Sequence, residues 1–445
     1  MHDDATRTAT RAAGPDHAAP RPGLLVVHHP DPAHLGVRLA VPTRGELMLG
    51  RKQASLPAGL LDDSRVSRRH ASIRSLRGVL QVEDLGSHNG TRIAGAPTTG
   101  ARPLAPGDVV GVGPVLFVVV DDVQARRGSR PGGLVGDSAA LAGIRALIDQ
   151  VAPTSTTVLV TGETGVGKEL VAREVHERSG RTGRLVTLNC ASIGDGVVQS
   201  ELFGHVRGAY SGAERPRKGL VLDAAGGTLF LDEVGDASPA LQANLLRLLQ
   251  EREVRAVGSD RTDVVDVRFV AATNVPLAAA ARDGLFRADL LSRLQRCVIR
   301  VPPLRQRRAD ILVLARHLAR RVTKGPVRFT AELAEALVVD DWPGNVRELA
   351  AIIERLALDD DGQPWPSAPW LPAELEARRA PALPAAQPTP SQASDRPDAD
   401  SLIAGLREHA GSITKLAAQL GIGRNTLYRW LREAGIDLDR VRDSL

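Results

Sequence analysis

The chain has 445 residues, which leaves room for roughly three domains at about 150 residues each. Apolar residues make up 43% of the sequence, so the chain can build real cores and is not disordered throughout. The net charge of +5, from 57 basic and 52 acidic residues, is too mild to indicate a nucleic-acid partner by itself. Aromatic residues amount to 3%, which argues against a protein that stacks single-stranded bases on exposed rings.

Short patterns exclude several other classes of protein. Cys190 and Cys297 lie far apart and form no C-x-x-C pair, which excludes a disulfide framework and a zinc finger. No apolar run approaches the roughly 18 residues needed to cross a membrane. The polar first residues lack the apolar segment of a signal peptide. We therefore expect a soluble, cytoplasmic protein of several domains.

The N-terminal part of the chain divides into a lead, a β-rich region and a linker. Residues 1–22 have no hydrophobic periodicity, and we expect them to be disordered. Residues 23–121 contain short β-type runs broken by Gly, Pro and Asn, which indicates an all-β domain. Residues 122–133 are rich in Gly and Arg and predict a flexible linker.

Three patterns follow one another in the β-rich region. Gly50-Arg51 comes first, S-R-R-H follows at 67–70, and L-G-S-H-N-G-T follows at 85–91 with an Asn-Gly turn signal. Ser-x-x-His alone is a weak signal, but the three patterns in this order resemble the forkhead-associated (FHA) domain. That domain is a β-sandwich that reads phosphothreonine.

The FHA resemblance implies a phosphopeptide site. Arg51 and Ser67 would bind the phosphate, because guanidinium and hydroxyl donors best meet a dianion. Arg68 would add charge, and Asn89 would bond the peptide backbone. A threonine-phosphorylated protein is then the expected partner. The alternative is a β-sandwich that is kept only for assembly.

From residue 134 to 360, apolar strands alternate with longer helical patterns, which indicates an α/β domain. A strand that ends at Val160 leads into G-E-T-G-V-G-K, a loop whose backbone N–H groups cradle phosphates at a helix N-terminus. Lys168 would reach the β- and γ-phosphates, and Glu169 stands where the general motif has Ser or Thr. The predicted nucleotide-binding residues of this loop are Gly162, Glu163, Thr164, Gly165, Val166, Gly167, Lys168 and Glu169.

A second motif supplies carboxylates. The apolar strand in G-G-T-L-F-L-D-E ends in Asp232 and Glu233. Asp232 can hold Mg²⁺, directly or through water, and Glu233 can polarise the attacking water. A solvated acidic turn explains this motif alone, but it explains poorly why both motifs occur in this order. The pair predicts a site that binds a phosphate chain and Mg²⁺ and activates water.

Residues 134–360 resemble the AAA+ domain of bacterial enhancer-binding proteins, the ATPases that activate sigma-54 RNA polymerase. Members usually carry Glu after the loop lysine, as Glu169 does here. The N-C-A segment implies that Asn189 restrains Glu233, and the A-A-T-N segment implies that Thr273 and Asn274 form sensor I. The W-P-G-N-V-R-E-L segment implies that Arg347 acts on the nucleotide from a helical lid.

The same resemblance implies a ring. The segment F-R-A-D-L-L-S-R-L at 286–294 is similar to the family's arginine-finger segment. Arg287 and Arg293 would act on the nucleotide of a neighbouring subunit, where a guanidinium stabilises charge on the γ-phosphoryl oxygens. Each arginine without the motif is more simply a surface salt bridge.

A glycine-flanked loop is similar to the family's sigma-54 contact, which reads GAFTGA. Here Tyr replaces Phe and Ser replaces Thr, so a ring and a hydroxyl remain. An aromatic side chain on a flexible glycine-rich tip is costly without a partner. The alternative is a ring that folds back onto its own domain. The predicted contact residues are Gly208, Ala209, Tyr210, Ser211, Gly212 and Ala213.

The C-terminal part predicts DNA binding. Residues 361–400 are rich in proline and read as a semi-extended tether. Residues 401–445 have the spacing of a helix-turn-helix, and A-A-x-x-L-G-I-x-R-x-T-L-Y-R resembles the Fis-type DNA-binding domain. The alternative is a generic solvated helix pair. The first turn of the second helix would meet base edges and phosphates. The predicted DNA contacts of this helix are Arg424, Asn425, Thr426 and Arg429.

Together these expectations describe a protein with an all-β FHA sandwich, an α/β P-loop AAA+ domain with a helical lid, and an all-α helix-turn-helix. The predicted function is a nucleoid-associated activator that binds enhancer DNA, senses a phosphothreonine protein and remodels sigma-54 RNA polymerase with ATP. Two rivals remain: a P-loop motor that acts on DNA or another protein, and a DNA-bound phosphoprotein adaptor with a decayed ATPase.

Overall fold

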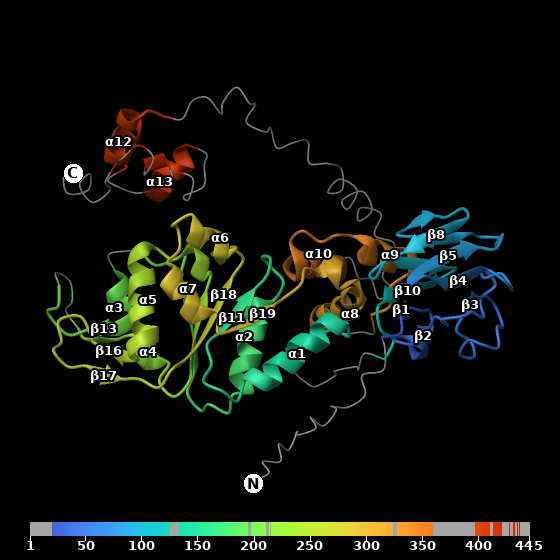
Figure 1. The fold of residues 1–445 in the computed structure, drawn as a ribbon, viewed down its shortest axis with the longest axis horizontal. Coiled ribbons are helices and arrows are strands. Elements are labelled where there is room, and N and C mark those ends of the chain that lie inside the picture. Colours follow the sequence, from blue (N-terminus) through green and yellow to red (C-terminus); the bar gives the residue numbers. More distant parts are fainter. Residues whose placement is uncertain are drawn as a thin grey trace, which may run out of the picture. The chain divides into compact units, whose positions relative to one another are not determined.

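The computed structural model describes residues 20–124, 133–194, 197–210, 215–323, 327–358, 397–409 and 413–420, with single residues at 213 and between 427 and 436. Contacts divide the chain into two compact units, Met1–Arg282 with Phe286–Pro372 and Asp283–Leu285 with Ala373–Leu445. The first unit contains the β-rich and α/β regions, and the second contains the C-terminal helices (Figure 1).

The β-rich region folds into two antiparallel sheets around one apolar core. Its strands are β1 (Gly23–His28), β2 (Arg38–Ala40), β3 (Glu46–Leu49), β4 (Ala71–Leu76), β5 (Val79–Asp84), β6 (Thr91–Ile93), β7 (Ala96–Pro97), β8 (Ala101–Leu104), β9 (Val109–Val112) and β10 (Val115–Val120). The strand orders are β2-β1-β10-β9-β6-β7 and β3-β4-β5-β8. Core residues recur every second position, as Leu24 and Val26 do in β1, because successive side chains point to opposite faces. This confirms the expected all-β sandwich.

The α/β region contains a five-stranded parallel sheet. Its strands are β11 (Val158–Thr161), β12 (Leu185–Asn189), β15 (Thr228–Asp232), β18 (Arg268–Thr273) and β19 (Cys297–Arg300), in the order β12-β15-β18-β11-β19. The central strand β18 is buried along its whole length, as expected for a parallel sheet with covered faces. Helices α1 (Ala139–Val151) and α2 (Lys168–Glu177) pack against strands of this sheet (Figure 1). The expected α/β fold is confirmed.

Further helices extend this core. They are α3 (Val198–Phe203), α4 (Leu220–Asp223), α5 (Pro239–Glu251), α6 (Leu277–Arg282) and α7 (Ala288–Leu294). Two short hairpins lie among them: β13 (Gly204–His205) pairs with β14 (Arg217–Lys218), and β16 (Glu253–Val254) pairs with β17 (Asp263–Val264).

A helical lid follows the sheet. It consists of α8 (Ile311–Val322), α9 (Ala331–Val339) and α10 (Asn345–Leu358). Trp342 sits fully buried between α9 and α10, and its indole N–H donates to the carbonyl oxygen of Leu337 at 2.8 Å. Burial of so large a side chain fixes the start of α10 relative to α9.

The second unit is a small helical core. Its described helices are α12 (Ala399–Glu408) and α13 (Ile413–Gln419). Leu402 and Leu406 of α12 pack with Leu416 of α13, and with Leu427 and Leu431 farther along the chain. This apolar cluster agrees with the predicted helix pair.

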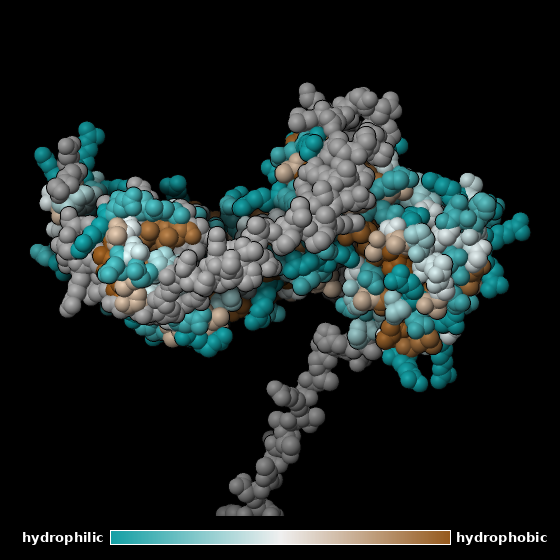
Figure 2. Space-filling model, turned by 90° about the horizontal axis from the view of Figure 1, so that it is seen from above, coloured by the Kyte–Doolittle hydropathy of each residue, from teal (hydrophilic) through white to brown (hydrophobic). Residues whose placement is uncertain are grey.

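On the face that Figure 2 shows, hydrophilic residues prevail and hydrophobic ones form small separate patches. None of the helices that the structure describes is both long and apolar enough to span a membrane.

Candidate functional site

The carboxyl ends of the parallel strands bring the predicted nucleotide residues together. In the sheet register, Thr161 pairs with Thr273, and Asn189 pairs with Asp232. In open α/β sheets, ligands bind at this edge. The P-loop, both carboxylates and sensor I therefore meet at one place, as the sequence predicts.

The P-loop is shaped by tight backbone packing. Gly165 has a φ of +78°, and a Cβ atom there would collide with the carbonyl oxygen of Gly344, so the position requires glycine. Lys168 begins α2, and its Nζ donates to the carbonyl oxygens of Gly162 at 3.0 Å and Glu163 at 3.2 Å. The ammonium thus lies across the loop, where a phosphate chain would pass.

Charges around Lys168 match a phosphoryl-transfer site. Burial lowers the pKa of Lys168, and the carboxylates Asp232 and Glu233 act in the opposite direction. Glu233 has a left-handed backbone with a φ of +52°, and its N–H donates to Asp232 Oδ1 at 3.0 Å. Strain of this kind costs about 1–3 kcal/mol and concentrates at functional sites. The backbone therefore holds Glu233 in a set orientation next to Asp232.

Asn189 and sensor I lie beside this pair of carboxylates. The Asn189 Oδ1 atom accepts the N–H of Ala191 at 2.9 Å, so its restraint of Glu233 stays a prediction. Thr273 is buried, and its hydroxyl accepts the N–H of Val275 at 2.9 Å. Asn274 donates from Nδ2 to the hydroxyl of Thr164 at 3.1 Å, which places sensor I in direct contact with the P-loop.

The lid also contacts the P-loop. Asn345 is fully buried, accepts the N–H of Leu304 at 2.9 Å and donates to the carbonyl oxygen of Thr164 at 3.1 Å. The N–H of Val346 donates to the carbonyl oxygen of Gly165 at 3.0 Å. Arg347 follows directly, and its Cβ atom lies beside Gly165 of the P-loop.

Two arginines that the sequence analysis did not identify bond to residues of the P-loop. Arg305 forms a double ion pair with Glu163, at 2.8 and 2.5 Å. Arg307 is buried and donates to the carbonyl oxygen of Val166 at 2.9 Å. Both follow β19 in an arginine-rich stretch that carries no local motif, so the sequence offered no signal for this role.

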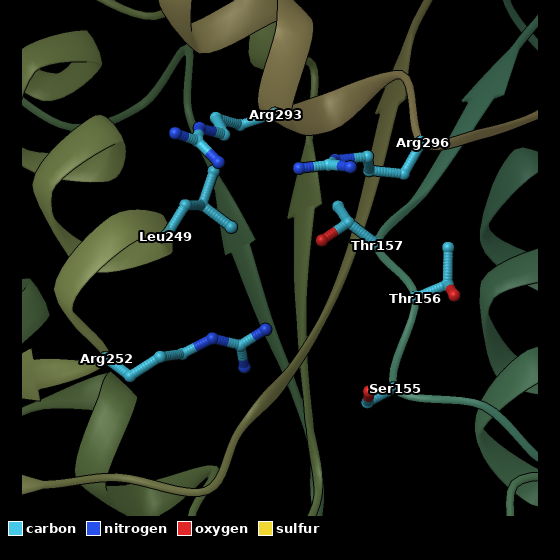
Figure 3. A pocket seen from close by; sticks show the side chains of 7 residues that line it. All are labelled: Ser155, Thr156, Thr157, Leu249, Arg252, Arg293 and Arg296. Carbon is cyan, nitrogen blue, oxygen red and sulfur yellow. The ribbon is translucent and has the colours of Figure 1, made fainter.

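The two predicted finger arginines have different surroundings. Arg287 precedes α7 and pairs with Asp289 at 2.8 Å, with about half of each side chain exposed. Arg293 lies in the last turn of α7 and lines a pocket with Arg252 and Arg296 (Figure 3). Its role toward a neighbouring nucleotide stays a prediction.

The described part of the loop that the sequence predicts to contact sigma-54 is closed on itself. The N–H of Gly208 donates to the carbonyl oxygen of Ala213 at 2.8 Å. The Tyr210 ring is 48% exposed and meets the His205 ring edge-on at a centroid distance of 5.2 Å. Its hydroxyl lies 3.4 Å from the hydroxyl of Ser200, a long contact. Ser211 and Gly212 lie outside the described residues.

The predicted phosphopeptide residues gather on loops at one end of the β-sandwich. The Arg51 N–H donates to the carbonyl oxygen of Ser67 at 2.9 Å, and the Ser67 hydroxyl accepts the His88 N–H at 3.1 Å. Asn89 donates from Nδ2 to the carbonyl oxygen of Arg65 at 2.8 Å.

Two residues brace these loops. His70 is fully buried and bonds the N–H of Ser67 and the carbonyl oxygen of Gly90, which ties two loops together. A Cβ atom at Gly50 would collide with the carbonyl oxygen of Arg68, so this glycine allows the close approach of the loops. Arg68 itself is exposed on the same loop.

The predicted DNA contacts cannot be placed. Arg424, Asn425, Thr426 and Arg429 lie outside the described residues.

Comparisons with known proteins match four segments of the chain to families. Residues 134–300 match the sigma-54 interaction domain, and residues 305–387 match the AAA+ ATPase lid domain. Residues 48–113 match the FHA domain, and residues 398–433 match the Fis family of bacterial regulatory proteins.

Similar proteins match about two thirds of this chain. The transcriptional regulatory protein ZraR of Escherichia coli O157:H7 is 45% identical over 300 residues, which cover 66% of this chain and 67% of ZraR. The nitric oxide reductase transcription regulator NorR1 of Cupriavidus necator is 41% identical over 346 residues, covering 70% and 67%. The crystal structure of NtrX from Brucella abortus in complex with ATP aligns with a TM-score of 0.50 at 34% identity, covering 69% and 70%.

These findings define a class and then a family. The fold and the site are those of a AAA+ ATPase with an FHA domain and a helix-turn-helix. The chain belongs to the sigma-54-dependent transcriptional regulators. Its central domain is an ATPase.

Proposed function

We propose that this protein opens sigma-54 promoters when a threonine-phosphorylated protein binds its FHA domain. The C-terminal helices hold it at enhancer DNA in the cytoplasm, and a homo-oligomeric ring supplies the ATPase. The observation that carries the proposal is the convergence of P-loop, carboxylates and lid at one sheet edge, with Asn274 and Asn345 bonded to Thr164. Nucleotide binding can thereby move the lid and sensor together.

ATP hydrolysis follows from the residues around Lys168. The ammonium neutralises charge on the β- and γ-phosphates, and Glu233 polarises the water that attacks the γ-phosphorus. Asp232 is an oxygen ligand of the kind that Mg²⁺ prefers, and it would hold that ion directly or through water. The bound ion would spread charge on the phosphates. Arg287 and Arg293 would act on the nucleotide of the adjacent subunit, and Arg347 on that of its own.

Coupling to sigma-54 runs through the Tyr210 loop. The loop follows α3, and its ring is half exposed on β13 of the same domain. The contact from its hydroxyl to Ser200 is weak at 3.4 Å, so the edge-on contact with His205 is the main interaction that holds the ring. We infer that movement of the domain during hydrolysis releases this ring toward sigma-54.

The FHA domain supplies the input. Arg51, Ser67 and Asn89 come from loops that hydrogen bonds already hold together, so the site is largely ordered before a ligand arrives. Pre-ordered donors lose little entropy on binding a phosphate dianion.

The test is to sequence the DNA that the protein binds in cells. Sites upstream of sigma-54 promoters support the proposal. Sites without any such promoter nearby would instead favour a DNA-bound motor or adaptor.

A further inference from the structure

An ion pair joins the FHA domain to the lid, and both belong to the same compact unit. Arg92 of β6 donates from Nε to both carboxylate oxygens of Glu335 on α9, at 3.0 and 2.9 Å. The two side chains are 25% and 15% exposed, so solvent screens this pair less than a fully exposed one. Helix α9 also packs against β9 and β10 of the sandwich. A lid helix therefore covers this face of the FHA domain.

The strand beside Arg92 leaves room for the ion pair. Gly111 of β9 lies opposite Arg92 in the sheet register. A Cβ atom at Gly111 would lie 2.8 Å from Nη2 of Arg92 and 3.2 Å from Oε1 of Glu335, so any other residue would crowd the pair. Arg92 also donates from Nη2 to the carbonyl oxygen of Gly113 at 3.1 Å, and this bond fixes the direction of the guanidinium.

A second contact joins α8 to β1. Arg316 of α8 donates to the carbonyl oxygen of Val27 at 3.3 Å, and its guanidinium lies 5.7 Å from the centroid of the Phe329 ring. A pocket of about 300 Å³ remains beside this contact, lined by Val27 and Gly36 of the FHA domain and by Val313 of α8, among others. Permanent cores contain few such voids, so the packing is that of an interface that can separate.

The covered face adjoins the predicted phosphopeptide loops. Arg92 follows Asn89 by three residues. Gly113, whose carbonyl oxygen binds Arg92, also touches the other loop: a Cβ atom there would lie 2.7 Å from Cγ2 of Val66, the residue before Ser67. A phosphopeptide bound by Ser67 and Asn89 would therefore act on the same segments that hold the lid.

The other side of the lid leads to the nucleotide site. The indole of Trp342 bonds to α9, and Asn345 at the start of α10 donates to the carbonyl oxygen of Thr164 in the P-loop. Lids of this kind move during catalytic cycles. A lid that is fastened to the FHA domain through α9 and to the P-loop through α10 has less freedom to move.

We propose that this face of the FHA domain is a docking surface for α9 of the same chain, and that docking restrains the lid and slows ATP turnover. A threonine-phosphorylated protein shifts the FHA domain toward the released form, because a ligand favours the state that it binds better. This second step rests on the proposed function. The docking and its effect on ATP turnover need no phosphopeptide.

The first experiment compares ATPase kcat of full-length Arg92→Gln and Glu335→Gln with that of wild type. We expect kcat to rise about fivefold or more in both variants, because each releases the lid. The double variant should match the single ones, since both changes remove one contact. Arg74→Gln is the matched control: it breaks an ion pair with Glu83 between β4 and β5 of the sandwich itself and should keep the wild-type kcat.

Folding is checked by thermal melting of each variant. Should Arg92→Gln melt early, Glu335→Gln tests the same contact from the lid. The exchange Arg92→Glu/Glu335→Arg rebuilds the pair with reversed charges and should lower kcat again toward wild type.

The second experiment tests the ligand by calorimetry, with the phosphothreonine peptide that binds wild type best in a library. The peptide should bind Glu335→Gln about fivefold more tightly than wild type, because the docked form no longer competes. Glu335 lies outside the FHA domain, so this gain does not come from a direct peptide contact. The same peptide should raise the kcat of wild type and leave that of Glu335→Gln unchanged.

The proposal is overturned if Arg92→Gln and Glu335→Gln hydrolyse ATP at the rate of Arg74→Gln. Raised kcat with equal peptide affinity in wild type and Glu335→Gln overturns release by the phosphopeptide and supports docking. Failure of the proposed function is distinguishable: a wild type that binds no phosphothreonine peptide contradicts the gating, while raised kcat in the two variants still supports the docking surface.

Discussion

Arg305 and Glu163 form an ion pair through both nitrogens and both oxygens, Nη1 to Oε2 at 2.8 Å and Nη2 to Oε1 at 2.5 Å. Glu163 belongs to the P-loop, and Arg305 lies between β19 and the lid. Asn345 at the start of α10 donates to the same carboxylate at 3.2 Å. The P-loop is thus fastened to the segment before the lid by an ion pair and to the lid itself by a buried amide.

The Arg305–Glu163 pair should persist in mild acid. Hydrogen bonds from Arg305 and then Asn345 lower the pKa of Glu163 from 4.5 to about 2. A lowered pKa means that the stabilisation is complete above pH 4.5 and is lost as the pH falls toward 2. A double-mutant cycle with Glu163→Gln and Arg305→Gln should therefore give the same coupling at pH 5 as at pH 7. Because the pair is partly exposed, we expect at most about 1 kcal/mol from chemical denaturation. Coupling that vanishes at pH 5 would contradict this pairing.

Glu233→Gln should retain ATP binding and lose turnover, because an amide cannot polarise the attacking water. Steady-state ATPase rates measure the turnover, and nucleotide titration of the same preparation measures the ATP binding. Arg287→Ala should also lose turnover while its nucleotide affinity stays closer to normal. Mixing the two inactive variants should restore some activity, and no recovery at any ratio would count against shared sites.

Tyr210→Ala should separate hydrolysis from promoter opening. The half-exposed ring contacts the buried residues His205 and Ser200 and lies outside the nucleotide site, so ATPase activity should remain close to wild type. Promoter opening should be lost, because the sigma-54 contact loses its aromatic group. Tyr210→Phe is the matched control: it keeps the ring, removes only the long hydroxyl contact and should open promoters. Equal opening by the Ala variant would remove Tyr210 from the mechanism.

Arg51→Ala should weaken phosphothreonine peptide binding about tenfold or more, because charge-assisted bonds are worth roughly 1.5–3 kcal/mol each. Calorimetry with a phosphothreonine peptide library measures the change. Arg69→Ala removes a neighbouring exposed charge that has no assigned role and should have a smaller effect. If wild type binds phosphorylated and unphosphorylated peptides equally, the FHA domain serves assembly instead.

Arg424→Ala and Arg429→Ala should weaken enhancer binding. A base-edge contact should cost roughly 1–3 kcal/mol and relax specificity, whereas a phosphate contact should weaken all sequences alike. Footprinting at several salt concentrations distinguishes the two. Unchanged footprints in both variants would exclude these residues from DNA recognition.

Much of the site could be predicted because its residues lie in contiguous motifs. The P-loop, Asp232 and Glu233 each follow a strand, and parallel strands place such ends at one edge. Arg305 and Arg307 escaped prediction because their partners are distant in the sequence and no local pattern marks them. Asn345 belongs to the W-P-G-N-V-R-E-L segment, from which only Arg347 was predicted as a site residue. The hydrogen bonds of Asn345 to Leu304 and Thr164 depend on the packing of the lid against the P-loop, which the sequence does not show.

The central claim is that ATP hydrolysis by this chain opens a promoter held by sigma-54 RNA polymerase. Permanganate footprinting of a sigma-54 promoter near a bound enhancer site, with full-length protein and phosphothreonine ligand supplied or omitted, tests it most directly. The account predicts melted DNA around the start site with ATP and wild-type protein, and none with Glu233→Gln or a non-hydrolysable analogue. Melting without ATP hydrolysis, or no melting by an active ATPase under either ligand condition, would contradict it.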